Sequence, residues 1–275
     1  MAVKQIKSLH KAIDVLEILD QLKACTLAEL HGHTGIPKAT LLRAIRTLEA
    51  RNFVRRSLAD DKYRANIALP HARTPATAGK VDESALASLA QAATPELEIL
   101  AQYLPWPSDV FVRSGLAMEL LETSRAQSPL LVNRNQIGDQ VQITVSAVGR
   151  TYLAYCSEKE REDILTGLEG APERYLPLRV DRRRLKSDLG AIRRQGYGLR
   201  DPRFAGATVA DETLADQLSA IAVPIRMGNR VAGCINMLWP KSAYSAAEFV
   251  QRHLDGLATA AVRIASALKP VHGRL

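Results

Sequence analysis

The chain has 275 residues, 47% of them hydrophobic and 24% charged, so it can bury one large core or two ordinary ones and is not expected to be disordered. No apolar run approaches the roughly 18 residues of a membrane-spanning helix, and the N-terminus lacks the apolar core of a signal peptide. The three cysteines are isolated and odd in number, which argues against a disulfide framework or a thiolate metal cluster and predicts a reducing, cytoplasmic location.

The net charge of +8 is unevenly distributed along the chain. Residues 1–75 contain 13 Lys and Arg against 7 Asp and Glu, whereas the rest of the chain contains 24 against 22. Such an asymmetry indicates a region that binds a polyanion, joined to a nearly neutral body.

Three helices are predicted in this basic quarter. Apolar residues at helical spacing predict the first helix over residues 8–23. A capping box, TLAE at residues 26–29, begins a short second helix that ends near Gly35. Pro37 suits the first turn of a third helix, because its missing N–H would have no partner there. A short helix, a tight turn and a longer helix form the pattern of a helix-turn-helix, whose second helix enters the major groove of DNA.

A cationic helix and a hairpin supply the candidate DNA contacts. One face of the third helix is apolar and the others are cationic or polar, and FVRR and KYRANIAL, joined by SLADD, predict two short strands that form a wing. A cationic helix face is more often only solvated. Here the cap, turn, helix, hairpin and charge asymmetry agree in order and spacing. The residues predicted to bind DNA are Thr26, Lys38, Thr40, Leu42, Arg43, Arg46, Arg55, Arg56, Lys62 and Arg64.

Residues 6–69 resemble the N-terminal domain of the IclR family of bacterial transcriptional regulators. IKSLHKAIDVLEIL resembles that family's first helix, and GIPKATLLRAIRTLEARNFVRR resembles its recognition helix and first wing strand. The resemblance implies a double-stranded DNA operator as partner. Asn52 stands where the family usually has Gly, which is tolerable because Asn also adopts left-handed backbone. Leu42 stands where a polar base-reading side chain is common, so it contacts a thymine methyl or reads nothing.

A linker is predicted at residues 70–83, which are rich in Pro, Ala, Thr and Gly. It separates a DNA-binding domain at residues 1–69 from a second domain at residues 84–275. A helix over residues 83–104, broken near Pro95, begins the second domain.

The second domain is predicted to be α+β, with two hairpins and helices on one side, and not doubly wound. Two apolar strands joined by the dipeptide GN form its last hairpin. The predicted strands are residues 109–115, 117–124, 140–145, 219–226 and 230–239, and the predicted helices lie around residues 148–168, 181–195 and 246–268.

This region resembles the GAF-like effector domain of the same family in the segments TVSAVGRTYLAY, RRQGYG and AIAVPIRMGNRVAGCINMLWP. The implied fold is a winged helix-turn-helix domain joined by a linker helix to a GAF-like effector-binding and oligomerisation domain. The implied partners are a small organic acid, a second copy of the chain in a homodimer or homotetramer, and RNA polymerase, with no cofactor. WPSDV, the VPIR and GCIN segments and the DD-containing wing resemble most the regulators of aromatic-acid breakdown.

Candidate effector-binding residues come from the helix start near residue 146 and from the last hairpin. Small residues and free amides at a helix start suit a carboxylate, although an ordinary helix N-terminus is the plainer alternative. Ser219 and Asn236 lie in apolar strands, so they bond either a ligand or neighbouring backbone. Arg134 is added as a cation that could pair with an acid, with a surface arginine as its alternative. With the family's ligand-contact positions, the predicted set is Arg134, Ser146, Ala147, Val148, Asp201, Ser219, Asn236 and Leu238.

Enzyme and metal signals are weak in this sequence. There is no G-x-S-x-G segment, Walker loop or G-x-G-x-x-G after a strand, so the chain is predicted not to be an enzyme. His31 and His33 are two residues apart on a helix and do not share a face for a metal ion. Cys156 and Cys234 lie in apolar segments and are interpreted as packing residues. Two alternatives stay open: an architectural DNA-binding protein without an effector, and an enzyme domain fused to a DNA-binding head.

Overall fold

The computed structural model describes residues 7–51, 53–66, 83–129, 137–172, 175, 181–202, 204 and 216–268. The chain divides into two compact units, Met1–Gln91 and Ala92–Leu275, and each is described by itself. Nearly all of the predicted linker at residues 70–83 lies outside the described residues, as does Arg134.

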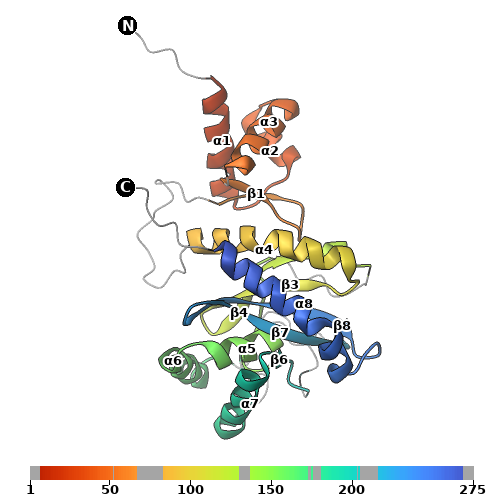
Figure 1. Ribbon diagram of the computed structural model, residues 1–275. Helices are drawn as coiled ribbons and strands as arrows, with labels where there is room; N and C mark the ends of the chain where they lie inside the picture. The colour runs from red at the N-terminus through yellow and green to blue at the C-terminus, as the bar shows by residue number, and fades with distance from the viewer. Residues whose placement is uncertain are drawn as a thin grey trace. The chain divides into compact units, whose positions relative to one another are not determined.

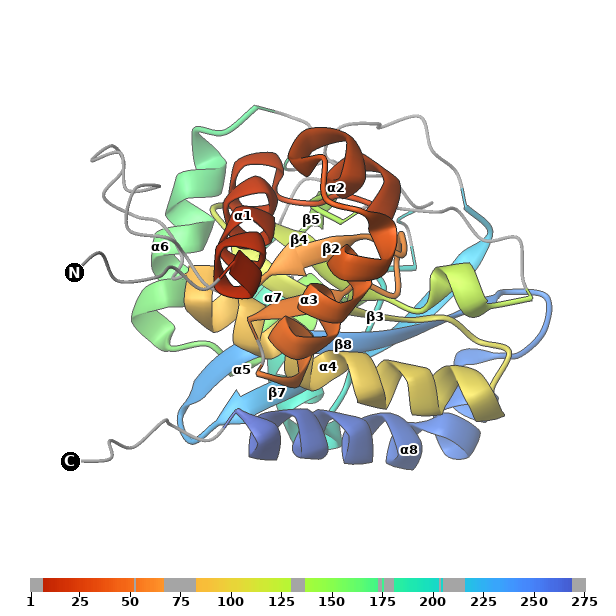
Figure 2. The same cartoon turned by 90° about the horizontal axis from the view of Figure 1, so that it is seen from above.

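The first unit contains a three-helix head, seen from above in Figure 2. The apolar residues of each helix recur every three or four positions, so one side of each helix can face a shared core. Val15, Leu30 and Ile45 are among the buried residues of that core, one from each helix. The helices are α1 (Lys7–Leu22), α2 (Leu27–Thr34) and α3 (Lys38–Ala50).

Local hydrogen bonds fix the turn between α2 and α3. The Glu29 amide donates to Thr26 Oγ1 at 3.2 Å and the Thr26 amide donates to Glu29 Oε2 at 2.7 Å, which confirms the predicted capping box. Gly35 ends α2 with a φ of 65°, a left-handed conformation that glycine adopts at little cost. His31 Nδ1 lies 2.8 Å from the Ile36 carbonyl oxygen across the same turn. The helix-turn-helix predicted from the sequence is therefore present.

The wing is a hairpin of β1 (Val54–Arg56) and β2 (Tyr63–Ala65). The strands are antiparallel, with Arg55 opposite Arg64. Residues 67–69 of the predicted second strand lie outside the described residues. Tyr63 also exchanges backbone hydrogen bonds with Cys25, at 2.8 and 3.1 Å, in the loop between α1 and α2. Because Tyr63 and Cys25 are both buried, this bridge anchors the wing to the core of the head.

A six-stranded antiparallel sheet forms the centre of the second unit. Its order is β5-β4-β3-β8-β7-β6. Met227 pairs with Arg230, so the predicted GN dipeptide makes a two-residue turn, and Gly228 has a φ of 59°. The strands are β3 (Ser108–Ser114), β4 (Ala117–Thr123), β5 (Gln140–Gln142), β6 (Gly198–Leu199), β7 (Leu218–Met227) and β8 (Arg230–Pro240).

Helices cover both faces of this sheet (Figure 1). On one face, Phe249 stacks on Trp239 with ring centroids 3.8 Å apart. On the other face, Leu238 belongs to the same apolar cluster as Ala147 and Val148. The prediction of helices on one side was wrong, because consecutive residues of β7 and β8 are apolar and bury both faces. The α-helices of this unit are the part of α4 (Glu83–Tyr103) that begins at Ala92, α5 (Ala147–Tyr155), α6 (Glu158–Glu169), α7 (Arg182–Gln195) and α8 (Ala246–Ala267).

Helix α4, which contains the boundary between the units, is continuous through Pro95. The predicted break is therefore wrong. Pro95 has no N–H to donate to the Gln91 carbonyl, and its side chain is exposed to solvent. Beyond Pro95, α4 runs beside α8 (Figure 2), and Arg263 Nη1 of α8 is 3.6 Å from Glu96 Oε2 of α4.

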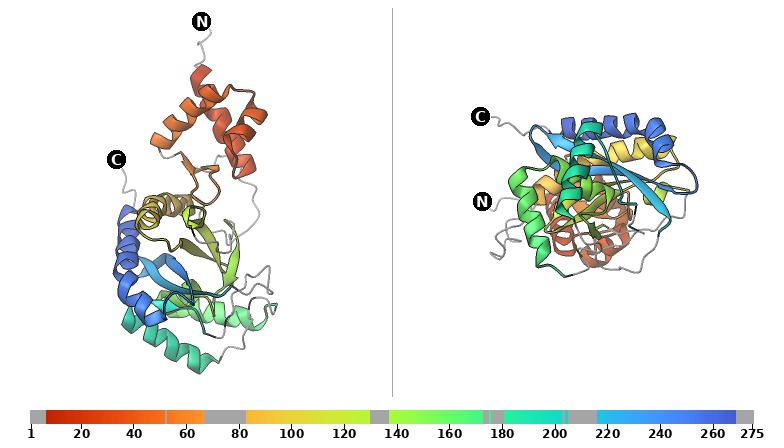
Figure 3. Two further views of the ribbon diagram at one scale, coloured as in Figure 1. Left: turned by 90° about the vertical axis from the view of Figure 1, so that its right-hand side faces the viewer. Right: turned by 90° about the horizontal axis from the view of Figure 1, so that it is seen from below.

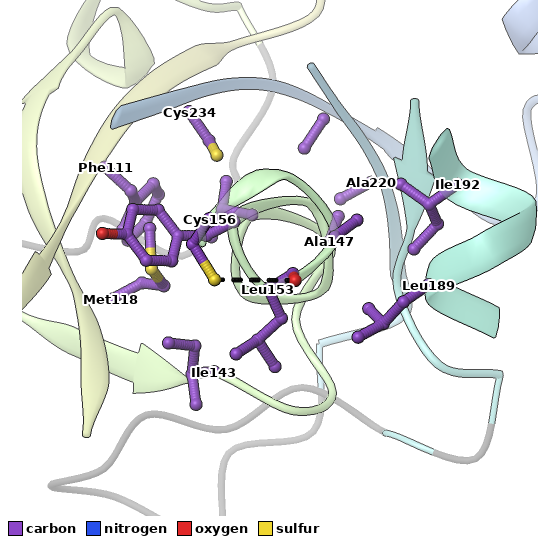
Figure 4. Packing of buried hydrophobic residues seen from close by; sticks show 14 of the residues in the cluster. Phe111, Met118, Ile143, Ala147, Leu153, Cys156, Leu189, Ile192, Ala220 and Cys234 are labelled. Carbon is purple, nitrogen blue, oxygen red and sulfur yellow. Dashed lines mark hydrogen bonds between the residues drawn. The ribbon is translucent and has the colours of Figure 1, made fainter. Parts of the chain in front are cut away.

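Helix α5 is buried almost throughout, with α6 and α7 packed beside it (Figure 3). Figure 4 shows it surrounded by Phe111, Ile143, Leu189 and other apolar side chains. The first turn of α5 passes very close to the chain that precedes it. A Cβ atom added to Gly149 would lie only 2.1 Å from the Ile143 carbonyl oxygen. Only glycine allows this approach of α5 to the end of β5.

A glycine-to-alanine pair tests this contact. Gly149→Ala is expected to lower the free energy of unfolding by about 1–3 kcal/mol, because backbone atoms must move apart. Gly256→Ala in α8 is the matched control: no heavy atom lies within 4 Å of its added Cβ, and helix propensity alone should raise the free energy of unfolding by up to about 1 kcal/mol. The two tryptophans of the chain, Trp106 and Trp239, lie in the second unit, so fluorescence during urea unfolding reports on it. Equal changes in the free energy of unfolding for the two substitutions would contradict the close contact between Gly149 and the Ile143 backbone.

Candidate functional site

Helix α3 presents cations on its solvent face. Leu41, Ile45 and Leu48 are buried, which fixes the opposite face toward solvent. Lys38, Arg43 and Arg46 are exposed there, with Thr40 and Leu42 half-buried beside them. Across the described parts of the chain, none of the three cations takes part in an ion pair. The charges of Lys38 and Arg43 are therefore available to an anionic partner, while Arg46 also interacts electrostatically with Glu49.

The four predicted cations of the wing have different surroundings. Arg64 Nη1 and Nη2 donate to Asp60 Oδ1 and Oδ2 at 2.8 and 2.7 Å, so this guanidinium is held by two parallel bonds. Arg56 Nη2 pairs with Asp61 Oδ2. Arg55 and Lys62 are half-buried. Arg56 and Arg64 thus already have a carboxylate partner, which the sequence analysis did not predict.

Thr26, also predicted to bind DNA, uses its hydroxyl within the head. Its Oγ1 donates to Glu29 Oε2 at 3.0 Å while accepting the Glu29 amide. The Thr26 amide, and after it the Thr26 hydroxyl, donates to the Glu29 carboxylate and holds the pKa of that carboxyl below its ordinary value. The observed role of Thr26 is to cap α2, and contact with DNA stays a prediction.

The start of α5 is built from three of the predicted effector residues. Ser146 caps the helix, accepting the Gly149 amide at 3.1 Å and donating to the Gln142 carbonyl at 2.7 Å. Ala147 and Val148 are buried in the apolar cluster with Leu238. Asp201 is brought next to them, because its amide donates to the Val145 carbonyl oxygen at 2.9 Å.

The two polar residues of the last hairpin do not share a face. Ser219 pairs with Trp239, whose ring stacks against α8, so Ser219 points to the α8 face and is half-buried. Asn236 has the strand parity of Leu238 and points to the α5 face. Its Oδ1 accepts the Asp109 amide at 3.0 Å, so it bonds neighbouring backbone, one of its two predicted alternatives. Replacing Asn236 by an apolar residue would therefore leave the buried amide of Asp109 without this acceptor.

A buried ion pair on the α5 face was missed by the sequence analysis. Asp109 is fully buried, and its carboxylate accepts Arg125 Nε at 2.9 Å and Nη2 at 2.7 Å. Thr123 donates its hydroxyl to the same carboxylate. The signal that could have found Asp109 is the one applied to Asn236, namely a polar residue in an apolar strand.

Thr144 is a second buried polar residue that the sequence analysis did not select. It lies two residues before the cap of α5 and is 4% exposed. Its Oγ1 has no hydrogen-bond partner among the residues that the structure describes. A buried hydroxyl left in this way costs about 1–3 kcal/mol, so a bound molecule that bonds it would gain affinity.

The cysteines of the second unit lie in its core. Figure 4 shows Cys156 and Cys234 among the apolar side chains around α5, with Cys156 Sγ 3.6 Å from the Leu153 carbonyl oxygen. Burial raises the pKa of the Cys156 thiol to about 11 and also raises the pKa of Cys234. Both thiols are protonated near neutral pH and are poor nucleophiles, which agrees with their interpretation as packing residues. In the parts of the chain that the structure describes, no helix is both long and apolar enough to span a lipid bilayer.

The chain is similar to known regulators over nearly its whole length. It is 23% identical to the HTH-type transcriptional regulator XynR of Escherichia coli over 199 residues, 70% of this chain and 74% of that protein. An IclR transcriptional regulator from Alicyclobacillus acidocaldarius superposes with a TM-score of 0.52 at 23% identity, covering 96% of this chain and 100% of the other. An IclR homologue from Microbacterium hydrocarbonoxydans, solved in complex with 4-hydroxybenzoate, gives a TM-score of 0.52 at 20% identity, covering 95% and 98%.

Two family domains account for both units. Residues 8–58 match the IclR helix-turn-helix domain, and residues 84–266 match the C-terminal domain of bacterial transcriptional regulators of the IclR type. Together they include the cationic α3, the first strand of the wing and the whole sheet with α5 and α8. The members of this family are transcriptional regulators and not enzymes. The chain belongs to the IclR family of DNA-binding transcriptional regulators.

Proposed function

We propose that this protein binds an operator through α3 and the wing, and that a small organic acid bound in the C-terminal domain changes its effect on transcription. The observation that supports operator binding most directly is the solvent face of α3, where Lys38, Arg43 and Arg46 are exposed without an ion pair in the described residues. Arginine on a helix in the major groove can contact phosphates or bond guanine edges. Residues 1–69 are the DNA-binding domain in this proposal, and residues 84–275 the effector domain.

In this proposal the protein works as a homodimer or homotetramer in the cytoplasm, with RNA polymerase as a further partner. A single short helix reads few base pairs, so two heads are needed to read two half-sites about one helical turn, roughly 34 Å, apart. An effector can change operator binding only if it binds one arrangement of the subunits better than another.

Arg43 supplies the sharpest test of the operator contact. Arg43→Gln is expected to weaken binding to a duplex selected by the wild-type protein from a random pool by about 1–3 kcal/mol, while binding to random-sequence DNA changes less. The measurement is fluorescence anisotropy over a range of salt concentrations. Arg183→Gln is the matched control, an exposed arginine at the start of α7 in the second unit, and it should leave both affinities unchanged.

The two DNA probes separate the outcomes for Arg43. Equal losses on selected and random DNA would make Arg43 a phosphate contact and not a base-reading residue. An unchanged affinity on both probes would remove Arg43 from the DNA interface.

The start of α5 supports the effector half of the proposal. Ser146, Ala147, Val148 and Asp201 meet there, and Thr144 beside them has a buried hydroxyl with no partner in the described residues. The IclR homologue that binds 4-hydroxybenzoate supports an acid, and specifically an aromatic acid, as the class of ligand to test first. A carboxylate is stabilised by the N-terminal end of a helix dipole, and an apolar wall suits an aromatic ring.

Thr144→Val tests this ligand site with little change in shape. Without ligand, the variant should be as stable as the wild-type protein or more stable, because it loses only a buried hydroxyl that lacks a partner. The rise in melting temperature that 4-hydroxybenzoate produces in the wild-type protein should be reduced or lost in the variant. Differential scanning fluorimetry measures both quantities.

Two controls make the result specific. Thr166→Val, at an exposed position of α6, should respond to the acid as the wild-type protein does. The corresponding alcohol, 4-hydroxybenzyl alcohol, should shift no melting temperature, because it lacks the carboxylate. A full response in Thr144→Val would place the site elsewhere, and a wild-type protein that responds to no aromatic acid would contradict this class of effector.

A further inference from the structure

The wing contains two aspartates at its turn as well as four cations. Asp60 binds Arg64 through both carboxylate oxygens, and the Arg64 side chain is only 14% exposed. Asp61 pairs with Arg56, at positions that are 72% and 53% exposed. Each aspartate thus neutralises one arginine of the surface that would face DNA.

Backbone geometry holds these aspartates in place. Asp60 Oδ1 also accepts the Lys62 amide at 3.1 Å, which fixes the carboxylate over the turn. Asp61 has a φ of 60°, a left-handed conformation, and its amide donates to the Ser57 carbonyl oxygen at 3.0 Å. The Arg56 guanidinium lies 5.7 Å from the centre of the Tyr63 ring, which positions it from the other strand. The pairs are therefore part of the folded hairpin.

Non-specific binding to DNA is almost entirely electrostatic, since each cation that neutralises a phosphate releases a counterion. A phosphate can use Arg64 or Arg56 only by competing with the carboxylate already bound, and the carboxylate repels it as well. Lys38 and Arg43 of α3 carry no such carboxylate in the described residues, and Arg46 makes no ion pair there but lies within electrostatic range of Glu49. The head therefore combines a cationic helix with a partly self-neutralised wing.

We propose that Asp60 and Asp61 restrain the attraction of the wing to phosphates and thereby raise the preference of the head for its operator over random DNA. This inference rests on the DNA binding proposed above. The two aspartates are specificity-determining residues although they repel the DNA. They lower the sequence-independent part of the affinity and leave the contacts of α3 with bases unchanged.

Asparagine substitutions test the proposal because asparagine keeps the local geometry. Asp60→Asn retains an Oδ1 that can accept the Lys62 amide, and Asp61→Asn is suited to left-handed backbone. Asp61→Asn is expected to bind a random-sequence duplex roughly two- to fivefold more tightly than the wild-type protein, the range that an exposed ion pair can account for. Asp60→Asn is expected to have a smaller effect in the same direction, because the Arg64 side chain that it releases is only 14% exposed. The slope of log affinity against log salt should steepen by up to about 0.9 for each additional phosphate that the wing neutralises. The affinity for a selected duplex should rise less than that for random DNA, so the specificity ratio should fall in each variant and fall furthest in the double variant; a level ratio in the double variant would contradict the proposal.

A matched control and two double-mutant cycles locate the effect. Asp163→Asn removes the same charge from an exposed position of α6 and should change neither affinity nor salt slope. In an Arg56→Gln background, Asp61→Asn should strengthen binding much less, because the cation it releases is absent. Asp60→Asn should likewise lose most of its effect in an Arg64→Gln background.

The possible results separate this inference from the function it rests on. Unchanged or weaker binding of random DNA by both Asp60→Asn and Asp61→Asn, with wild-type melting temperatures, would overturn the inference while leaving operator binding intact. If Asp60→Asn lowers the stability of the head, Asp61→Asn decides alone, because its ion pair is the more exposed. A wild-type protein that binds no selected duplex at all would overturn the proposed function itself.

Discussion

The ladder between β7 and β8 is the constraint on which the second unit depends. β3 pairs with β8 and β6 pairs with β7, while α5 packs on one face of the hairpin and α8 on the other. Because both faces are covered, the register of this hairpin decides which side chains meet which helix. A shift by one residue would exchange Leu238 and Trp239, removing the stacking on Phe249 and forcing an indole into the cluster around α5. The start of α5 is thus positioned by the register of strands far from it in sequence.

Most polar side chains in a sheet buried on both faces need a partner, although the buried Ser108 hydroxyl in β3 has none among the described residues. Asn236 and Asp109 meet this requirement together, since Asn236 accepts the Asp109 amide and the Asp109 carboxylate binds Arg125. Removing either partner of that ion pair would leave a buried charge alone, which is far more costly than replacing both. The hydroxyl of Thr144, which follows β5, likewise has no partner among the described residues. A missing partner therefore makes a buried polar residue a candidate for ligand binding, which only a binding experiment can decide.

The features predicted correctly from the sequence depend on residues close together in the chain. The capping box at Thr26, the helix end at Gly35 and the GN turn of the last hairpin each require only a few consecutive residues. The features predicted wrongly depend on distant segments. Pro95 is predicted to break α4, yet the helix continues through it with the Pro95 side chain exposed to solvent. Ser219 was grouped with Asn236, yet strand pairing places them on opposite faces.

The same reasoning explains why a count of charges cannot identify the DNA-binding surface. The wing sequence DDKYR places Asp60 four residues before Arg64, and the turn brings Asp61 to Arg56, so these two arginines find carboxylates within five positions. Helix α3 contains a single acid, Glu49, near its C-terminal end, so Lys38 and Arg43 have no carboxylate one turn away on the helix. The excess of positive charge is shared by both elements, but the positions of the few acids decide which cations remain available. On this basis we expect α3 to be the part of the head with the strongest attraction for DNA, and the wing to contribute less than its number of arginines suggests.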